Sequence, residues 1–402
     1  MSVAHIVGTG MTAFGKSPHA TTRSLAEDAV GAALADAGVS PGEVGMVFFG
    51  NAVGGLITGQ EMIRGQAALR HTGLLGLPIV NVENACASSS TAFKLAVDAV
   101  AAGSVDVAIA VGAEKLTHPD KTRSFAAIGT AIDLFKLDEI KRRVGAEQGD
   151  AEDVDGKRSF FMDVYAANTR DYMRATGATR EDFAEVAVKS HAHAALNPKA
   201  QYRDPVTVAE VLASRMVADP LTLLMCSPIG DGAAAVVVCS ADRARRLGRP
   251  SVRVRASVLV SGTDREPGQP GSVQRASSMA YDAAGIGPAE LDVIEVHDAA
   301  APAELMTYEE LGLCAPGEGP VLLRSGETLL GGKRVVNPSG GLLSKGHPIG
   351  ATGCAQLVEL ADQLRGRCGR RQVPDARTAL AENAGGFLGN DNAVTVVSVL
   401  SA

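Results

Sequence analysis

The residue best suited to chemistry in this sequence is Cys86, which lies in the stretch NVENACASSS. Because β-branched residues precede it and small residues follow it, we expect a strand to end before Cys86 and a helix to begin after it. The N–H groups and positive dipole end of a helix N-terminus favour a thiolate, so this position is expected to lower the thiol pKa. The alternative is a small apolar core residue, as free cysteines often are.

Two histidines can supply the base that a nucleophilic thiol needs. His347 lies in SKGHPIGATG, between a glycine and a proline at an expected helix start, where its ring is free to take a proton from a thiol. His297 lies in VIEVHDAAAP at the end of an expected strand, where an imidazole can donate a hydrogen bond to a carbonyl oxygen. The plain structural alternatives are a turn for the first motif and a helix cap for the second.

A glycine pair completes the set of candidate groups. Gly385 and Gly386, in ENAGGFLGND, follow another expected strand and can bring backbone N–H groups close to a ligand, as an oxyanion hole requires. Such a pair is otherwise simply a turn. Each of these signals is weak alone, so their meaning depends on the elements that carry them.

Composition and cysteine pattern narrow the class of protein. Hydrophobic residues make up 46% of the chain and charged residues 21%, which indicates a globular protein. The net charge of -7 and the lack of a long basic block argue against nucleic acid as a partner. The cysteines show no CxxC or metal-finger spacing, which predicts a reducing compartment, free thiols and no metal site. We interpret as structural Cys226, Cys239, Cys314, Cys354 and Cys368.

The elements that must position these groups alternate along the chain. Short β-branched runs and amphipathic small-residue stretches follow one another, which predicts an α/β fold with a largely parallel sheet. Strands are expected at 4–10, 45–50, 78–85, 105–112, 232–240, 251–262, 291–299, 333–341, 378–386 and 392–400. Helices are expected at 24–38, 88–103 and 347–366. The charged, aperiodic segment 118–220 is interpreted as an insertion of loops and helices.

Local signals mark two helices, and a repeat relates the two halves of the chain. Ser24 and Glu27 have capping-box spacing, Gly38 suits a helix C-terminus, and Thr179 and Asp182 suggest a second box. The second half repeats the strand pattern of the first. The thiol and the Gly-His-Pro segment each follow the third strand of their half, so a pseudo-twofold axis would bring the two helix N-termini together.

In combination, these motifs resemble the thiolase superfamily, with the closest match to thiolases of the sterol-carrier-protein-X type. The resemblance runs over nearly the whole chain. Besides the blocks around the thiol, both histidines and the glycine loop, it includes HIVGTGMTAF, MDVYAANTRDYMRATGATREDFAEVAVKSHAHAALNP, CSPIGDGAAAVVV and VVNPSGGLLSKGHPIGATG.

The resemblance implies a five-layered αβαβα fold of two pseudo-twofold-related halves with an inserted loop domain. The halves would be residues 1–117 plus 221–245 and residues 246–402, with the loop domain at 118–220. It also implies a homodimer or tetramer and covalent catalysis. Cys86 would attack an acyl thioester, His347 would activate the thiol, and His297 would assist from the strand end. The backbone N–H groups of Cys86 and Gly386 would form the oxyanion hole.

The sequence departs from the family where carbon–carbon bond chemistry needs a second acid/base. The common loop C-x-G-G-G-x-G has its cysteine at the position of Asn383 here, and the His-Asp-Cys-Phe segment of the sterol-carrier type reads His297, Asp298, Ala299, Ala300. Neither asparagine nor alanine can abstract a proton. The small alanine pair is instead expected to leave room beside the catalytic centre, as a bulky or ring-containing acceptor would need.

Three functions remain open. The first is an acyltransferase that passes an acyl group from Cys86 to an acceptor that is already nucleophilic. The second is an acyl-CoA thiolase or retro-aldolase with a substitute base, and it differs from the first in exchanging an acyl α-proton with solvent. The third is a non-catalytic subunit bound to a small zinc-ribbon/OB-fold protein. Retention of Cys86 beside both histidines argues against the third, and we favour the first.

Coenzyme A is the expected acyl donor, although an acyl-carrier protein stays open. Lys157 and Arg158 are candidates for its phosphates on charge alone, with a solvated charge pair as the alternative. No permanently bound cofactor is expected. Because the N-terminus lacks a signal-peptide pattern and no apolar run reaches about 20 residues, we expect a cytoplasmic protein without a membrane anchor.

Overall fold

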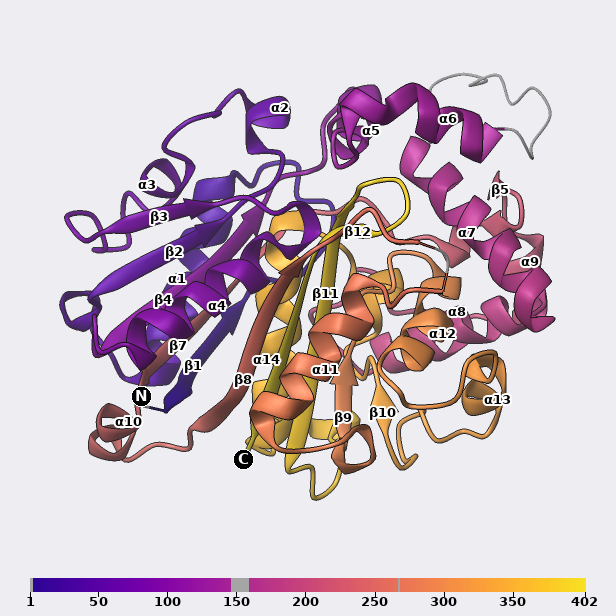
Figure 1. The fold of residues 1–402 in the computed structure, drawn as a ribbon. Helices are drawn as coiled ribbons and strands as arrows, with labels where there is room; N and C mark the ends of the chain where they lie inside the picture. The colour runs from indigo at the N-terminus through magenta and orange to yellow at the C-terminus, as the bar shows by residue number, and fades with distance from the viewer. Residues whose placement is uncertain (1–2, 146–158, 267) are drawn as a thin grey trace.

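The structure, a computed structural model, describes residues 3–145, 159–266 and 268–402. Ten strands form one sheet in the order β10-β9-β11-β12-β8-β1-β7-β4-β2-β3 (Figure 1). The first half contributes β1 (Ala4–Met11), β2 (Met46–Gly50), β3 (Ile79–Val82), β4 (Val107–Glu114) and β7 (Gly232–Ser240). The second contributes β8 (Val252–Ser261), β9 (Val293–Glu295), β10 (Val335–Val336), β11 (Thr378–Phe387) and β12 (Asn392–Ser401).

The two halves have the same topology. Counted along each half, the strand order is third, second, fourth, fifth, first in both. The second strand pairs in parallel with the third and fourth, and the fourth–fifth and fifth–first pairs are antiparallel, again in both halves. Strands β1 and β8 join the halves through a short antiparallel ladder. The predicted duplication is therefore confirmed. The prediction of a largely parallel sheet is wrong, because five of its nine strand pairs are antiparallel: the fourth–fifth and fifth–first pairs of each half and the β1–β8 pair.

Helices cover both faces of each half and so create the five layers. Helix α1 (Thr22–Ala37) lies on the outer face of the first half, and α11 (Ser272–Ala284) lies on β8 and β12 of the second. Helices α4 (Ser88–Ala101) and α14 (Thr352–Leu364) contact each other in the central layer, and each contacts strands of both halves. Strand β4 is buried along its whole length because helices cover both of its faces, which explains its continuous apolar sequence.

The segment between β4 and β7 supplies a helical layer that reaches over the second half. Helices α7 and α8 pack on α12 (Ala301–Glu310), and α8 also contacts α13 (Gly319–Arg324). The domain boundaries given above stay predictions. The elements of this segment are α5 (Lys121–Gly129), α6 (Leu137–Gly145), α7 (Phe160–Thr176), α8 (Arg180–Ala194), α9 (Val208–Ala213), β5 (Met216–Ala218) and β6 (Leu221–Thr222). Three short helices complete the fold: α2 (Gly54–Thr58), α3 (Arg64–Ala68) and α10 (Ala241–Leu247).

The helix signals were mostly, but not entirely, correct. Gly38 adopts the left-handed conformation at the end of α1, and Thr179 forms the predicted capping box with Asp182. The predicted Ser24–Glu27 box is wrong, because α1 begins three residues earlier and Ser24 closes a box with Thr21 instead. Among the described residues, none of the helices combines the length and apolar character that crossing a bilayer requires.

The central contact between α4 and α14 depends on small residues. A Cβ added to Gly353 would lie 2.5 Å from the backbone N of Ser90 and 2.9 Å from Asn383 Oδ1. The Ser89 hydroxyl accepts a 3.0 Å hydrogen bond from the backbone N–H of Cys354. The serine run after Cys86 therefore lets the two helix N-termini approach closely.

Substitution of Gly353 tests this contact. Gly353→Ala forces a methyl group against the backbone of α4, so it should lower the free energy of unfolding by about 1–3 kcal/mol, as overpacked cores do. The matched control is Gly31→Ala on the exposed face of α1, where no atom lies within 4 Å of the added Cβ. The control should raise stability by up to about 1 kcal/mol through helix propensity. Urea denaturation measures both, and equal effects would contradict the close approach.

Candidate active site

A strained turn presents Cys86 to the interior. The residue before it, Ala85, has a left-handed φ of +48°, which costs a non-glycine residue about 1 kcal/mol or more. Hydrogen bonds hold the turn, since the Ala85 N–H donates to Glu83 Oε1 at 2.6 Å and the Ser88 hydroxyl donates to the Ala85 carbonyl at 2.6 Å. The backbone strain at Ala85 therefore lies in the turn that sets the direction of the Cys86 side chain.

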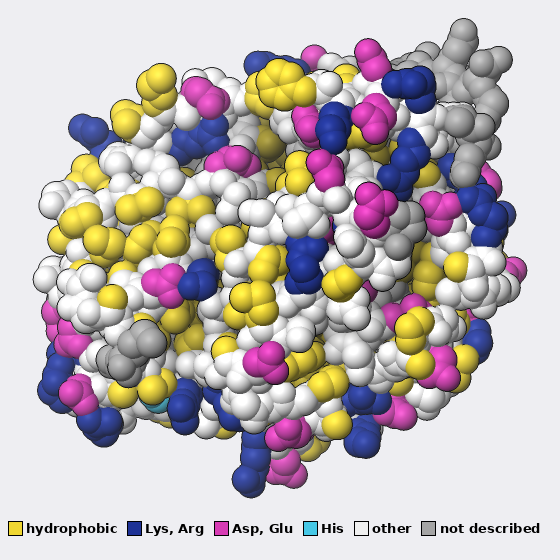
Figure 2. All heavy atoms as spheres, viewed as in Figure 1, with side chains coloured by type: hydrophobic (Ala, Val, Ile, Leu, Met, Phe, Trp, Pro, Cys, Tyr) yellow, Lys and Arg dark blue, Asp and Glu magenta, His cyan; other side chains and the backbone are white. Residues whose placement is uncertain are grey.

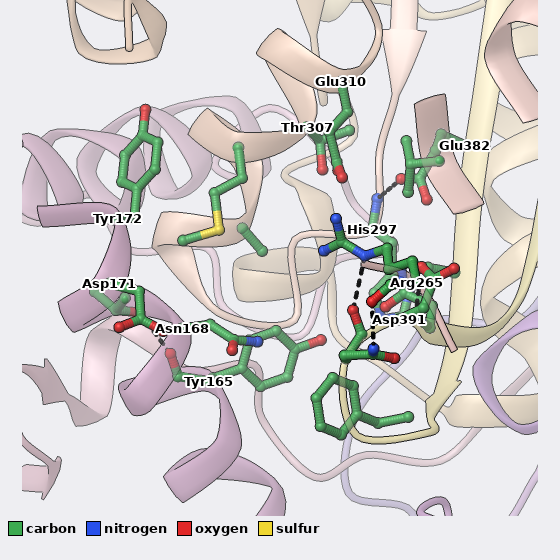
Figure 3. Close-up of a pocket in the computed structure, with 18 of the residues that line it drawn as sticks. Tyr165, Asn168, Asp171, Tyr172, Arg265, His297, Thr307, Glu310, Glu382 and Asp391 are labelled. Atoms are coloured by element: carbon green, nitrogen blue, oxygen red, sulfur yellow. Dashed lines mark hydrogen bonds between the residues drawn. The ribbon is translucent and has the colours of Figure 1, made fainter. Parts of the chain in front are cut away.

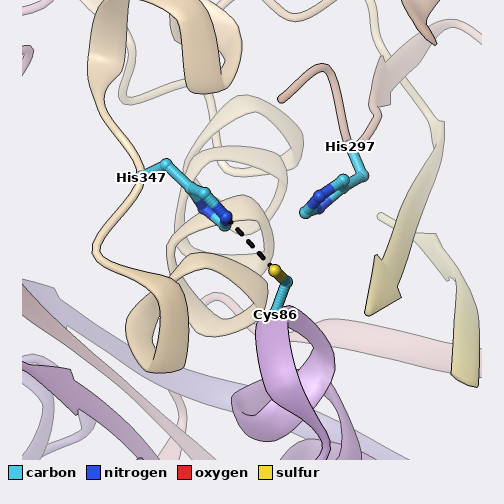
Figure 4. A group of neighbouring side chains, drawn as sticks. All are labelled: Cys86, His297 and His347. Atoms are coloured by element: carbon cyan, nitrogen blue, oxygen red, sulfur yellow. Dashed lines mark hydrogen bonds between the residues drawn. The ribbon is translucent and has the colours of Figure 1, made fainter. Parts of the chain in front are cut away.

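The structure brings Cys86, His297 and His347 together between the halves (Figure 4). Cys86 Sγ lies 3.3 Å from Nε2 of His347. The two imidazole rings are nearly perpendicular, at 83°, with centroids 5.1 Å apart. The three residues come from the start of α4, the loop after β9 and the loop before α14, so no single segment carries the cluster.

A hydroxyl group fixes the tautomer of His347. Thr352 Oγ1 lies 2.7 Å from His347 Nδ1 and donates its own hydrogen to the Pro348 carbonyl at 3.2 Å. The hydroxyl oxygen therefore accepts the Nδ1–H of the imidazole. This leaves the lone pair of Nε2 directed at the Cys86 thiol, as a general base requires.

Buried side chains also hold His297. Its Nδ1 lies 3.0 Å from Nδ2 of Asn383, and its backbone N–H donates to Glu382 Oε2 at 2.9 Å. Asn383, at one of the two positions where the family carries its second thiol, thus orients a histidine. Nε2 of His297 takes part in neither hydrogen bond, so it stays available to a group bound beside Cys86 and His347.

Glu114 ties the loop of His347 to the first half of the chain. This fully buried carboxyl accepts hydrogen bonds from the backbone N–H groups of Ala52 and Gly350 and from the Asn51 side chain. Gly350 lies three residues after His347, so the network fixes the base relative to β4. Burial raises the pKa of Glu114 to about 7.

Burial keeps the thiol and both imidazoles uncharged. It raises the pKa of Cys86 to about 12, although the backbone N–H groups of Gly386 and Cys86 pull in the opposite direction. The expected lowering of the thiol pKa by the helix N-terminus is therefore wrong, because desolvation outweighs it. Burial lowers the pKa of His297 to about 4 and holds that of His347 well below its ordinary value, with His297 and Lys345 as smaller causes. The resting pair is a neutral thiol and a neutral imidazole.

Gly386 lies where the predicted oxyanion hole needs it. Its φ of +64° is left-handed, and its N–H group and that of Cys86 both interact with the Cys86 sulfur. A Cβ on the neighbouring Gly385 would lie 2.6 Å from the Asn84 carbonyl, so only glycine lets β11 pass this close to the turn. The role of these N–H groups as an oxyanion hole stays a prediction.

Cys86 and both histidines open into a cavity of about 360 Å³, here called the thiol cavity. Its lining includes the cationic residues Lys16, Lys121 and Arg215, and no Asp or Glu among the described residues. No motif in the sequence marks these three residues, because they lie far apart in the chain. The residues predicted for phosphate binding, Lys157 and Arg158, lie outside the described residues.

The room expected at the alanine pair is only half present. Ala299 lines the thiol cavity, whereas Ala300 is fully buried and pairs with Cys226 in an isolated β-bridge. Cys226, which we interpreted as structural, also lines this cavity. Its pKa is raised by burial to about 12, so it too rests as a thiol.

The cluster also has the geometry of a metal site. The ligand atoms of Cys86, His297 and His347 lie within 4.8 Å of one another. A cysteine and two histidines are ligands that suit zinc, with a fourth position left for water. The sequence-based expectation of no metal stays a prediction, and a metal at this place would compete with nucleophilic use of the thiol.

Comparisons with known proteins identify the family to which this fold belongs. Residues 4–242 match the family described as "Thiolase, N-terminal domain", and residues 262–399 match "Thiolase C-terminal domain-like". The acetyl-CoA acetyltransferase of Methanothermobacter thermautotrophicus is 39% identical over 95% of this chain and 96% of its own. Benzoylsuccinyl-CoA thiolase subunit BbsB of Thauera aromatica is 39% identical over 95% and 94%, respectively.

Two further similarities extend the comparison. Human sterol carrier protein 2 is 36% identical over 94% of this chain and 69% of its own. The solved structure of the "Ltp2-ChsH2(DUF35) aldolase" superposes with a TM-score of 0.79 and 28% identity, over 100% of this chain and 98% of that one.

The fold consists of two five-stranded halves of the same topology, and a cysteine and two histidines lie between their helix N-termini. These features define a class of α/β enzymes that act on acyl groups. The chain belongs to the thiolase family, as the predicted resemblance to the sterol-carrier-protein-X type implied.

The pKa of Cys86 makes a prediction for its alkylation. Iodoacetamide reacts with the thiolate, and with a pKa of about 12 the thiolate fraction grows roughly tenfold per pH unit through the neutral and mildly alkaline range. Alkylation of the Cys86 peptide, followed by mass spectrometry, should therefore rise without a plateau from pH 7 to 9.5. A plateau near pH 7 would indicate a preformed thiolate–imidazolium pair and contradict the neutral resting state.

Proposed function

We propose that the protein is a thiolase-like acyltransferase that forms an acyl-Cys86 intermediate from an acyl-CoA and passes the acyl group to a nucleophilic acceptor. The observation that carries this proposal is the 3.3 Å contact between Cys86 Sγ and the unprotonated Nε2 of His347. A half-buried cysteine such as Cys86 would not need, for packing alone, an imidazole whose tautomer is fixed by a hydroxyl group.

The first step loads the enzyme. As Cys86 Sγ attacks the thioester carbon, its proton passes to Nε2 of His347, and the new oxyanion lies at the N–H groups of Cys86 and Gly386. Collapse of this intermediate breaks the bond to the coenzyme A sulfur, which takes the proton back from His347 and leaves as a thiol. Because the thiol and imidazole begin neutral, no charge has to be held in the buried site before substrate arrives.

The second step unloads the enzyme onto the acceptor. An amine, an alcohol or an electron-rich carbon attacks the acyl-Cys86 carbon, and its proton passes to His347. The bond to the Cys86 sulfur then breaks, and the sulfur takes this proton from His347, which restores the neutral pair. Nε2 of His297 faces the same centre and can hold the carbonyl oxygen of the substrate. Since Asn383 and Ala299 occupy the two positions of the family's second thiol, the scheme uses acceptors that need no α-proton removed.

The charges around the thiol cavity support coenzyme A as the donor. Lys16, Lys121 and Arg215 face it without a carboxylate among the described lining residues, which favours an anionic ligand. Two of the relatives reported above carry a coenzyme A thioester in their names. These cations are further candidates for the phosphates, beside Lys157 and Arg158, which stay a prediction.

Carbon–carbon bond cleavage is the second candidate function. The relatives include a thiolase subunit, and the similar solved structure is of an aldolase. In this chain the base would have to be a group other than a second thiol at the two family positions. The name of that solved structure includes a DUF35 protein, so we also propose a small partner protein, of the zinc-ribbon/OB-fold kind expected from the sequence, as a subunit.

We propose a homodimer through the edge strand β3. Strand β3 ends the sheet, and exposed apolar side chains gather beside it, as the left side of Figure 2 shows. An exposed strand edge with an apolar surround is prone to pair with another strand. The exposed side chains are Leu56, Met62, Ile63, Leu75 and Val80. Sedimentation equilibrium should show a dimer for the native chain and dissociation for Val80→Lys; a native monomer would refute this interface.

Intact-mass spectrometry after incubation with acetyl-CoA and longer acyl-CoAs tests the proposed function. We expect an acyl adduct on the native protein and none on Cys86→Ala. In D₂O, the α-protons of acetyl-CoA should stay unexchanged during loading if acyl transfer is the activity, whereas exchange would favour the carbon–carbon bond reaction. A native protein without any adduct would refute the acyl-Cys86 mechanism.

The same assay tests the orientation of His347. Thr352→Val removes the hydroxyl that accepts its Nδ1–H, so the loading rate should fall roughly tenfold or more, part of the 10²–10⁴ that a general base supplies. Thr352→Ser keeps the hydroxyl and should retain most of the rate. Equal thermal stability of the two variants would separate loss of positioning from loss of fold, and equal loading rates would contradict the assignment.

A further inference from the structure

A second cavity, of about 430 Å³, also has His297 in its lining (Figure 3). His297 and Tyr165 line both this cavity and the thiol cavity, so the two spaces meet at these residues. Residues of α7, α12 and β11 form its walls, and we call it the Glu310–Glu382 cavity after two carboxyl groups in its lining.

Buried polar atoms in this cavity lack partners. Glu382 is 1% exposed; its Oε2 accepts the His297 N–H, while its Oε1 has no hydrogen-bond partner among the described residues. Oδ1 of Asn390 is unpaired in the same sense. Unpaired buried acceptors cost free energy, so they mark places where a ligand can donate hydrogen bonds.

The charged residues that line the Glu310–Glu382 cavity disfavour both cationic and anionic ligands. Arg143 and Arg265 line it and donate to backbone carbonyls of residues 389 and 390, so they bring positive charge that disfavours a cationic ligand. Asp171 and Asp391 also line it and disfavour an anionic one. Burial raises the pKa of Glu310 to about 7 and that of Glu382 to about 8, in keeping with an uncharged ligand. When Glu382 is protonated, its Oε1 donates a hydrogen bond instead of accepting one, and a ligand hydroxyl group suits both forms because it can donate and accept.

The two cavities therefore suit different parts of a substrate. The thiol cavity carries cations without carboxylates among its described lining residues, whereas the Glu310–Glu382 cavity mixes both signs and offers unpaired acceptors. A hydrocarbon in the latter would leave Glu382 Oε1 unpaired. Because Thr307 is 5% exposed and also lines this cavity, a hydroxyl donor for the ligand's own oxygen is present as well.

We propose that the Glu310–Glu382 cavity is a second substrate subsite, which binds an uncharged, hydroxyl-bearing group. The rest of the substrate passes beside His297 and reaches the acyl carbon on Cys86. The inference rests on the proposed function and names its substrate class. The hydroxyl-bearing group can belong to the distal end of the acyl chain or to the acceptor. In the second case the acceptor O–H proton passes to His347, an ester bond forms, and the bond to Cys86 sulfur breaks.

Crystal soaks test the cavity without any catalysis. We would soak crystals of Cys86→Ala in cis-1,3-cyclohexanediol and, separately, in 1,3-dimethylcyclohexane, whose methyl groups match the hydroxyls in size. The diol should appear in the Glu310–Glu382 cavity and the dimethyl compound should not. Ala303→Leu, which fills this cavity from α12, should remove the diol. Its control is Ala35→Leu on the exposed face of α1, which should leave the diol in place.

Loading and unloading rates identify the source of the hydroxyl group. In the donor arm, ω-hydroxyacyl-CoAs of four to eight carbons are compared with methyl-ended acyl-CoAs of matched length. One added hydrogen bond to a buried acceptor should speed loading of Cys86 roughly tenfold, and Ala303→Leu should abolish the preference. In the acceptor arm, the diol should discharge acetyl-Cys86 faster than buffer, and again Ala303→Leu should remove the effect.

Each outcome of these experiments either supports or overturns the proposed subsite. A diol bound in the cavity together with a preference in either kinetic arm supports the subsite and assigns its source. Diol density without a kinetic preference means binding at crystal concentration only and overturns the proposal, as does an empty cavity. If no acyl-CoA loads Cys86, the proposed function fails; diol binding would then leave a polar cavity but no substrate subsite, which also overturns the inference.

Discussion

The close approach of two helix N-termini is the constraint on which the rest of the structure depends. Helices α4 and α14 meet in the central layer at Ser89, Ser90 and Gly353, where a single added Cβ would clash with backbone. This contact brings the turn of Cys86 and the loop of His347 to hydrogen-bond distance, although 261 positions separate them in the chain. Small side chains there are thus a condition for the chemistry and not only for packing.

Burial then decides how the site works. The helix N-terminus and two backbone N–H groups favour a charged thiol, yet the enclosed position favours a neutral one and outweighs them. A neutral pair needs no counter-charge, so the thiol and the imidazole can lie in an apolar surround at the end of the thiol cavity with the proton still on the sulfur. The Thr352 hydroxyl and the Asn383 amide each bind the Nδ1 atom of a histidine, so they leave the two Nε2 atoms for the cluster.

The sequence predicted the architecture well because its signals were local or repeated. Periodicity located the strands, and the position of Cys86 and His347 after equivalent strands predicted their convergence. Three features of the structure were not predicted from the sequence. The predicted start of α1 is wrong because Ser24 is not the N-cap residue. It lies within the first turn and forms a capping box with the N-cap residue Thr21. The thiol pKa depends on enclosure by distant segments, and the cations of the thiol cavity come together only in the folded chain.

The repeated strand order has a consequence for the origin of the site. The Cys86 thiol lies in the segment that follows the third strand of the first half, and the His347 imidazole lies in the segment that follows the third strand of the second half. Neither half could therefore perform the reaction as a separate molecule in its present form. Two identical halves would place like groups opposite each other, so a thiol can face an imidazole here only because the two halves differ in sequence at these positions.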